Sequence, residues 1–222
     1  MSETEAVNDV AASPAVRGRL HRPSGTTHAS LVLTHGAGSN CNAPLLIALS
    51  EAFAGRGVAT LRCDLPYRQR QPQGPPRATA AEDQAGLRRA VELLKKLDSG
   101  PVFMGGVSYG GRQATILAAS EPGLVEGLII LSYPLHPPGK PDQLRTAHLP
   151  KIQNRALFIS GAKDVFGSPD EIRAAIALIP AKVSFLSIEG AGHELGFGRG
   201  SRAHLDFPER IVYAFEELFP LT

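Results

Sequence analysis

The stretch Pro101-Val-Phe-Met-Gly-Gly-Val-Ser-Tyr-Gly-Gly111 decides how this chain folds. Its first half is a short apolar run of the kind found in strands buried on both faces, and it ends in the pattern Gly-x-Ser-x-Gly around Ser108. Glycines on both sides of the serine leave room for a following helix to cross close to the strand. Ser108 is therefore a candidate nucleophile at a sharp turn. The alternative is a glycine-rich turn that carries an ordinary serine.

Apolar runs and helical patterns alternate along the rest of the chain. The runs that predict buried strands are 29–34, 58–63, 127–131, 155–160 and 183–188. The clearest helix start is Ser168-Pro-Asp-Glu171, which combines a capping box with proline at the first helical position. This alternation predicts an α/β fold, with a mostly parallel central sheet and helices on both faces.

Length and composition limit the possible architectures and partners. With 222 residues, 43% of them hydrophobic, the chain is long enough for one buried core, so we expect a single domain over 15–222 after a flexible N-terminal arm over 1–14. A formal charge of +2 creates no field that favours nucleic acid or an anionic membrane. Acidic residues near the N-terminus and the lack of a long apolar run predict a cytoplasmic protein. Cys41 and Cys63 show no disulfide or metal-binding spacing, and we expect neither metal nor cofactor.

Three polar residues follow three of the predicted strands. Ser108, Asp164 and His193 come at carboxyl ends, where ligands bind in parallel α/β sheets. A serine hydroxyl needs an imidazole to accept its proton, and a carboxylate on the other ring nitrogen fixes the tautomer. The order Ser, Asp, His thus predicts a catalytic triad. Asp170 and Glu189 are rivals for the acid, although Asp170 suits a first helical turn and Glu189 is close to His193 in sequence.

The oxyanion that forms on attack needs preorganised N–H donors. We expect them from the backbone of Tyr109, directly after the nucleophile, and of Ala37 in the loop His35-Gly-Ala-Gly38, with His35 bracing that loop. Arg68, Arg70 and Arg77 lie in a proline-rich loop over 65–78 that is predicted to be irregular. They are either solvated or positioned to bind a substrate carboxylate. His136 lies on a second proline-rich loop that could overhang the site.

The chain resembles α/β-hydrolases over about residues 15–220. Four segments, Leu33–Gly38, Asp64–Arg68, Tyr133–Gly139 and Phe158–Gly161 with Asp164, resemble the dienelactone-hydrolase-like branch, and within it the small lidless proteins related to the NSL complex subunit 3. Dienelactone hydrolases use a cysteine nucleophile, whereas Ser108 stands in that place here. The resemblance therefore implies an α/β-hydrolase fold without a lid domain and an ordinary serine esterase.

Two functions follow as hypotheses. The first is a serine hydrolase, a carboxylesterase that forms an acyl enzyme on Ser108 from small, short-acyl esters. We expect a small-molecule ester as its substrate and neither nucleic acid nor membrane as a partner, and the oligomeric state is left open. The second is a non-catalytic binding or scaffold protein, as the resemblance to a chromatin-complex subunit permits.

Overall fold

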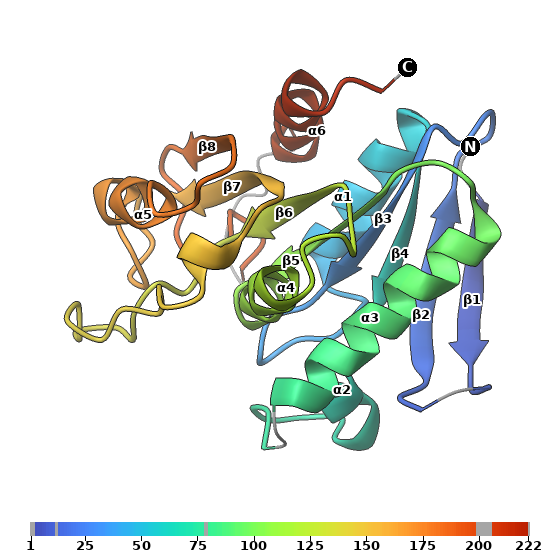
Figure 1. The fold of residues 1–222 in the computed structure, drawn as a ribbon, viewed down its shortest axis with the longest axis horizontal. Coiled ribbons are helices and arrows are strands. Elements are labelled where there is room, and N and C mark those ends of the chain that lie inside the picture. The colour runs from blue at the N-terminus through green and yellow to red at the C-terminus, as the bar shows by residue number, and fades with distance from the viewer. Residues whose placement is uncertain (1–2, 12, 78–79, 199–205, 222) are drawn as a thin grey trace.

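The computed structural model describes residues 3–11, 13–77, 80–198 and 206–221. Its strands form one sheet in the order β1-β2-β4-β3-β5-β6-β7-β8 (Figure 1). The strands are β1 (Glu3–Asp9), β2 (Val16–Arg22), β3 (Ala29–Thr34), β4 (Val58–Cys63), β5 (Val102–Val107), β6 (Gly127–Leu131), β7 (Arg155–Gly161) and β8 (Val183–Ile188). The helices are α1 (Pro44–Gly55), α2 (Pro66–Arg70), α3 (Ala80–Leu97), α4 (Tyr109–Ser120), α5 (Pro169–Ile176) and α6 (Phe207–Leu218), with a short 3₁₀ helix η1 (Leu149–Lys151).

Strands β3 to β8 run parallel to one another, while β1 and β2 are antiparallel to their neighbours at one edge. The predicted α/β class with a mostly parallel sheet is confirmed. Because the carboxyl ends of parallel strands lie at the same end of the sheet, the loops that follow β3, β5, β7 and β8 converge there.

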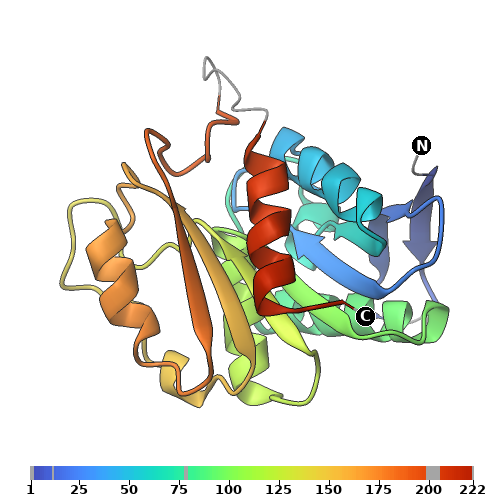
Figure 2. The same ribbon diagram turned by 90° about the horizontal axis from the view of Figure 1, so that it is seen from above.

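Two layers of helices cover the sheet, and each layer buries its own apolar core. Helices α1 and α6 pack on one face, against alternate strand residues such as Leu31, Phe103 and Ile129 (Figure 2). Helices α3, α4 and α5 pack on the other face, against Val32, Met104 and Ile130. Adjacent strand residues therefore point into opposite cores, so the interior strands must be apolar throughout.

The N-terminal segment corrects one expectation from the sequence. Residues Glu3–Asp9, predicted to belong to a flexible arm over 1–14, form β1 and pair in register with β2 from Glu3 opposite Arg22 to Asp9 opposite Val16. Most of β1 is exposed, and Glu5 pairs with Arg22 at 2.9 Å across the strands. The loop over 65–78 is also not entirely irregular, because α2 starts at Pro66, where proline is tolerated in a first turn.

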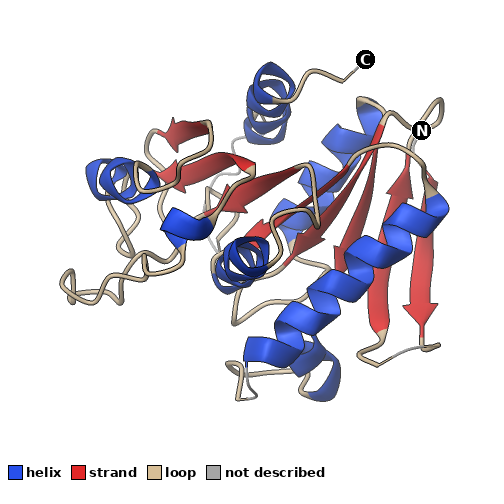
Figure 3. Ribbon diagram, in the orientation of Figure 1, coloured by secondary structure: helices blue, strands red, loops and turns tan. Residues whose placement is uncertain are grey.

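The connection between β6 and β7 is almost all loop. Within it, the described residues form only the three-residue helix η1 (Figure 3). So short a helix presents no apolar face that could close over a site, in keeping with the prediction of a fold without a lid domain.

The start of α5 tests the cap predicted for it. The Ser168 hydroxyl accepts the Glu171 N–H while the Glu171 side chain accepts the Ser168 N–H, so the capping box of α5 is confirmed. The sequence Thr79-x-x-Glu82 also has the spacing of a capping box, but Thr79 lies outside the described residues. No helix in the described part of the chain has the length and apolarity needed to cross a bilayer.

His21 of β2 is buried beside a cation. Its Nε2 accepts a hydrogen bond from Nε of Arg62 at 2.9 Å, and Arg62 itself is buried. Burial, together with the adjacent guanidinium, lowers the pKa of His21 to about 4, because a charged ring would lose its solvation and face a second positive charge.

Acidification should therefore destabilise the fold. Below the ordinary pKa of 6.5, the unfolded chain binds a proton at His21 that the native state refuses, so stability is fully present above 6.5 and is lost progressively toward pH 4. Urea unfolding at pH 7 and pH 5 measures the loss. In His21→Gln the loss should be smaller, whereas replacing exposed His28 by Gln should leave it unchanged. An equal loss in wild type and His21→Gln would contradict the assignment.

Candidate functional site

Ser108 sits on a strained turn between β5 and α4. Its φ of +51° and ψ of −114° lie in a backbone region that residues other than glycine rarely adopt. Its N–H donates to the Leu131 carbonyl of the neighbouring strand at 2.8 Å. The flanking glycines are required by contact. A Cβ on Gly106 would come within 2.8 Å of the Thr34 carbonyl oxygen, and one on Gly110 within 2.6 Å of that of His35. This close packing holds the serine at the end of the sheet.

The three side chains predicted to act together are brought together. Nε2 of His193 lies 2.9 Å from Oγ of Ser108, and its Nδ1 lies 2.8 Å from Oδ2 of Asp164. Since the carboxylate can only accept, Nδ1 carries the proton and Nε2 presents a lone pair to the hydroxyl. The Asp164 side chain is wholly buried and also accepts the Phe166 N–H at 2.9 Å, while the His193 side chain is 22% exposed. The Phe166 ring lies 4.2 Å from the imidazole ring, centroid to centroid.

The rival acids lie elsewhere. The Asp170 side chain is 97% exposed and pairs with Arg173 on its own helix. Glu189 is exposed, and the hydrogen bonds formed by the described part of the chain include none from Glu189 to His193. The geometry singles out Asp164 as the carboxylate partner of the imidazole.

The loop after β3 lies directly beside the serine. A Cβ built on Gly36 would stand 3.5 Å from Cβ of Ser108. The Gly36 carbonyl accepts hydrogen bonds from Nδ1 of His35 at 2.9 Å and from the Tyr67 hydroxyl at 3.2 Å. In a planar trans peptide the following N–H, that of Ala37, must point the opposite way. The Tyr109 N–H has no intrahelical acceptor because Tyr109 is the first residue of α4.

His35 braces this loop, as the sequence predicts. Its ring is fully buried, and Nε2 accepts the Leu65 N–H at 3.2 Å while Nδ1 donates to Gly36. Burial lowers the pKa of His35, which keeps the ring neutral and suited to these two opposite roles.

The predicted substrate-binding arginines are engaged in other contacts. Buried Arg68 donates to four backbone carbonyls, those of Ser39, Gln71, Ala37 and Gly74, at 2.7–2.9 Å. Neither alternative expected for Arg68, a solvated side chain or one that binds a substrate carboxylate, describes it: its guanidinium ties α2 to the loop after β3. The half-exposed Arg70 side chain pairs with Glu82.

His136 is buried in the loop after β6. Its Nδ1 donates to the Pro137 carbonyl at 2.9 Å, and its Nε2 lies 3.6 Å from a carboxylate oxygen of Glu171. Its backbone N–H donates to the carbonyl of Phe166, the residue whose ring contacts His193. His136 is thus linked to the site through Phe166 and makes no hydrogen bond to Ser108 or His193 among the described residues.

Metal binding and cysteine reactivity are the other kinds of chemistry to compare with the described residues. They include no group of three or more His, Cys, Asp or Glu side chains that could hold a metal ion. Both cysteines are free and buried, and burial near Asp64 raises the pKa of the Cys41 thiol to about 11, which leaves it unreactive.

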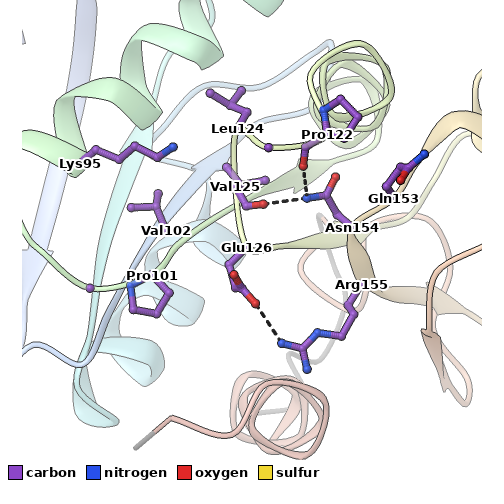
Figure 4. Close-up of a pocket in the computed structure, with 12 residues that line it drawn as sticks. Lys95, Pro101, Val102, Pro122, Leu124, Val125, Glu126, Gln153, Asn154 and Arg155 are labelled. Atoms are coloured by element: carbon purple, nitrogen blue, oxygen red, sulfur yellow. Dashed lines mark hydrogen bonds and ion pairs between the residues drawn. The ribbon is translucent and has the colours of Figure 1, made fainter.

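A cavity of about 540 Å³ lies at the opposite end of the strands (Figure 4). It is bordered by the loops that enter β5, β6 and β7, and an ion pair of Glu126 with Arg155 at 3.1 Å forms part of its wall. Asn154 closes one side by donating to the Val125 carbonyl at 2.7 Å. Because Val102 begins β5 and Ser108 follows its end, this cavity is separate from the serine site.

A family model described as an alpha/beta hydrolase domain matches residues 27–209. This chain belongs to the alpha/beta hydrolase family. The matched range includes Ser108, Asp164 and His193, so this α/β hydrolase has all three residues within its family domain.

Solved structures agree on the fold of this α/β hydrolase. A dienelactone hydrolase from Anabaena variabilis is 21% identical with a TM-score of 0.73, covering 98% of this chain and 97% of that one. Est1E from Butyrivibrio proteoclasticus, solved with ferulic acid, is 19% identical with a TM-score of 0.77 and covers 96% and 99%. XC6422 from Xanthomonas campestris, described as a serine hydrolase without lid, is 15% identical with a TM-score of 0.77 and covers 99% and 97%. At these identities the likeness concerns the fold alone.

Proposed function

We propose that this α/β hydrolase is a serine carboxylesterase that acts on small, short-acyl esters through an acyl enzyme. The observation that carries the proposal is the unbroken chain of hydrogen bonds from Asp164 through His193 to Ser108. Serine, imidazole and carboxylate in this order form the arrangement that activates a hydroxyl at neutral pH.

Acylation begins when Oγ of Ser108 attacks the ester carbonyl carbon and passes its proton to Nε2 of His193. Asp164 stabilises the imidazolium through Nδ1. The carbonyl oxygen becomes an oxyanion, which the N–H groups of Ala37 and Tyr109 stabilise. When the tetrahedral intermediate collapses, the bond to the alcohol oxygen breaks, and His193 returns the proton to the departing alcohol.

Deacylation repeats these steps with water. His193 accepts a proton from the water as its oxygen attacks the acyl carbon, and it then protonates Ser108 as the carboxylic acid leaves. No group beyond these residues is needed, and the proposal includes no cofactor.

The preference for short acyl groups rests on the connection between β6 and β7. With only η1 in that stretch, the described residues between β6 and β7 form no helical cover under which a long acyl chain would be buried. A deep apolar pocket would add roughly 0.8 kcal/mol of binding for each buried methylene, and an open site forgoes most of it.

A scaffold role is the second candidate. The four segments that resemble the small lidless proteins related to the NSL complex subunit 3 favour it, as does the fact that folds of this kind serve many functions. An intact Ser-His-Asp arrangement counts against it. A cytoplasmic location, and the expectation of neither nucleic-acid nor membrane partners, stay predictions.

Ser108→Ala should abolish turnover of p-nitrophenyl acetate, because no other side chain replaces the nucleophile, and it should leave the melting temperature nearly unchanged. A fluorophosphonate probe should label the wild type at Ser108 and leave the variant unlabelled. Ser120→Ala, a change at the far end of α4, is the matched control and should behave as wild type. Folded wild type that resists the probe would instead favour the scaffold role.

Asp164→Asn should preserve the fold but present the wrong imidazole tautomer. If the behaviour of serine proteases carries over, kcat falls by about 10⁴-fold. Exposed Asp170→Asn serves as the control and should retain full activity. A larger loss from Asp170→Asn than from Asp164→Asn would refute the assignment of the acid.

A series of p-nitrophenyl esters from acetate to decanoate tests acyl specificity. We expect kcat/KM to be highest for the short acids and to stop rising by about hexanoate, since further methylenes gain little burial in an open site. A steady climb through decanoate would overturn the proposal of a short-acyl preference and leave the serine mechanism intact.

A further inference from the structure

Asp83 is a fully buried carboxylate that the proposed mechanism does not use. It lies in the first turn of α3, where the helix dipole favours a negative charge. One oxygen accepts the Tyr109 hydroxyl at 2.7 Å and the other accepts the Tyr67 backbone N–H at 3.0 Å. No Lys, Arg or His within the described ranges forms an ion pair with it.

Stability alone gives little reason to keep such a group. Burying a carboxylate without a cationic partner is costly, and well-packed apolar residues usually serve a core as well or better. Charge-assisted hydrogen bonds recover part of that cost, and they also fix the positions of their donors. The two donors here are the Tyr109 hydroxyl and the Tyr67 N–H.

The first donor leads to one half of the expected oxyanion hole. Tyr109 follows the nucleophile and begins α4, and its backbone N–H is the donor expected from the turn at Ser108. Its phenol donates a hydrogen bond to Asp83. Burial is the main cause that raises the pKa of this phenol, and the hydrogen bond to Asp83 raises it further. The residue is therefore fixed at both its backbone and its hydroxyl, and the orientation of the first turn of α4 is fixed with it.

The second donor leads to the other half. Asp83 holds the backbone of Tyr67, and the Tyr67 hydroxyl donates to the carbonyls of Gly36 at 3.2 Å and Ala37 at 2.8 Å. Holding the Gly36 carbonyl fixes the plane of the peptide that carries the Ala37 N–H. The rings of Tyr67 and Tyr109 meet edge to face, with centroids 5.7 Å apart, so the two halves also contact each other.

We propose that Asp83 is a positioning residue that sets both N–H donors of the oxyanion hole, through Tyr109 on one side and through Tyr67 on the other. This rests on the proposed serine hydrolase function. Asp83 does not touch substrate. It acts by preorganising donors that must already point at the oxyanion before charge develops there.

Tyr109→Phe is the sharpest test, because it removes one oxygen and keeps the ring. Loss of a whole oxyanion donor costs about 10²–10³ in kcat, so a displaced donor should lower kcat by about tenfold or more while KM changes little. A trifluoromethyl ketone, whose adduct with Ser108 carries an oxyanion, should bind more weakly by the same factor as kcat/KM falls. Tyr213→Phe, an exposed tyrosine on α6, is the matched control and should match wild type.

The carboxylate is tested by Asp83→Asn against Asp98→Asn, a residue just beyond the other end of α3 that accepts the Ser30 hydroxyl at 2.9 Å. Only Asp83→Asn should lower kcat and weaken the ketone. Once Asp83 is replaced, adding Tyr109→Phe should cost much less than it does alone, because both changes act on one contact. Assays run well below each variant's melting temperature separate this effect from unfolding.

The outcomes distinguish the two proposals. If a fluorophosphonate fails to label Ser108 of the wild type, both the hydrolase function and the positioning role are overturned. If the wild type is labelled and active, and the Tyr109→Phe and Asp83→Asn variants keep full kcat and full affinity for the ketone, only the positioning role is overturned. Equal losses from Asp83→Asn and Asp98→Asn would also overturn it, since they would indicate a general effect on α3.

Discussion

The close approach of α4 to β5 at Ser108 is the constraint on which the site depends. The chain must reverse direction between a buried strand and a buried helix without room for a loop, and it does so at a serine with φ of +51°. Such strain persists only where surrounding structure imposes it. Here the bond from the Ser108 N–H to Leu131 and the contacts of Gly106 and Gly110 with β3 impose it. The nucleophile's position is thus set by the centre of the sheet.

Backbone carbonyls next to the serine are held by side chains, and this decides where the free N–H groups point. His35, Tyr67 and Arg68 together bind the carbonyls of Gly36, Ala37 and Ser39. A loop with three glycine or alanine residues would otherwise have several accessible conformations. Side chains of α2 thus hold the loop after β3, although no hydrogen bond among the described residues joins them to the three residues of the proposed triad.

Much of this arrangement was predictable from sequence, because its strongest signals are local. The apolar runs, the elbow and the Ser168 capping box each depend on a few adjacent residues. Strand β1 was missed because its exposed, acid-rich residues carry no burial pattern, and it exists only by pairing with β2. The role of Arg68 was not predictable, because composition shows that a loop is basic but not which backbone carbonyls its guanidinium can reach. The burial of Asp83 does have a sequence signal: it falls four residues before Leu87, on the buried stripe of α3.

The acid and the base of the site form a unit of their own. The Lys163 N–H donates to the Ala191 carbonyl at 2.8 Å, which joins the loop after β7 to the loop after β8. Gly161 makes this possible, because a Cβ there would come within 2.4 Å of the same carbonyl oxygen. Asp164 and His193 are consequently fixed to each other by backbone contacts, and Ser108 is fixed to β6. The loop after β3 is fixed to α2, which Asp83 links to α3. The 2.9 Å contact between His193 and Ser108 is where these units meet, so its geometry depends on the parallel strands that carry them to one edge.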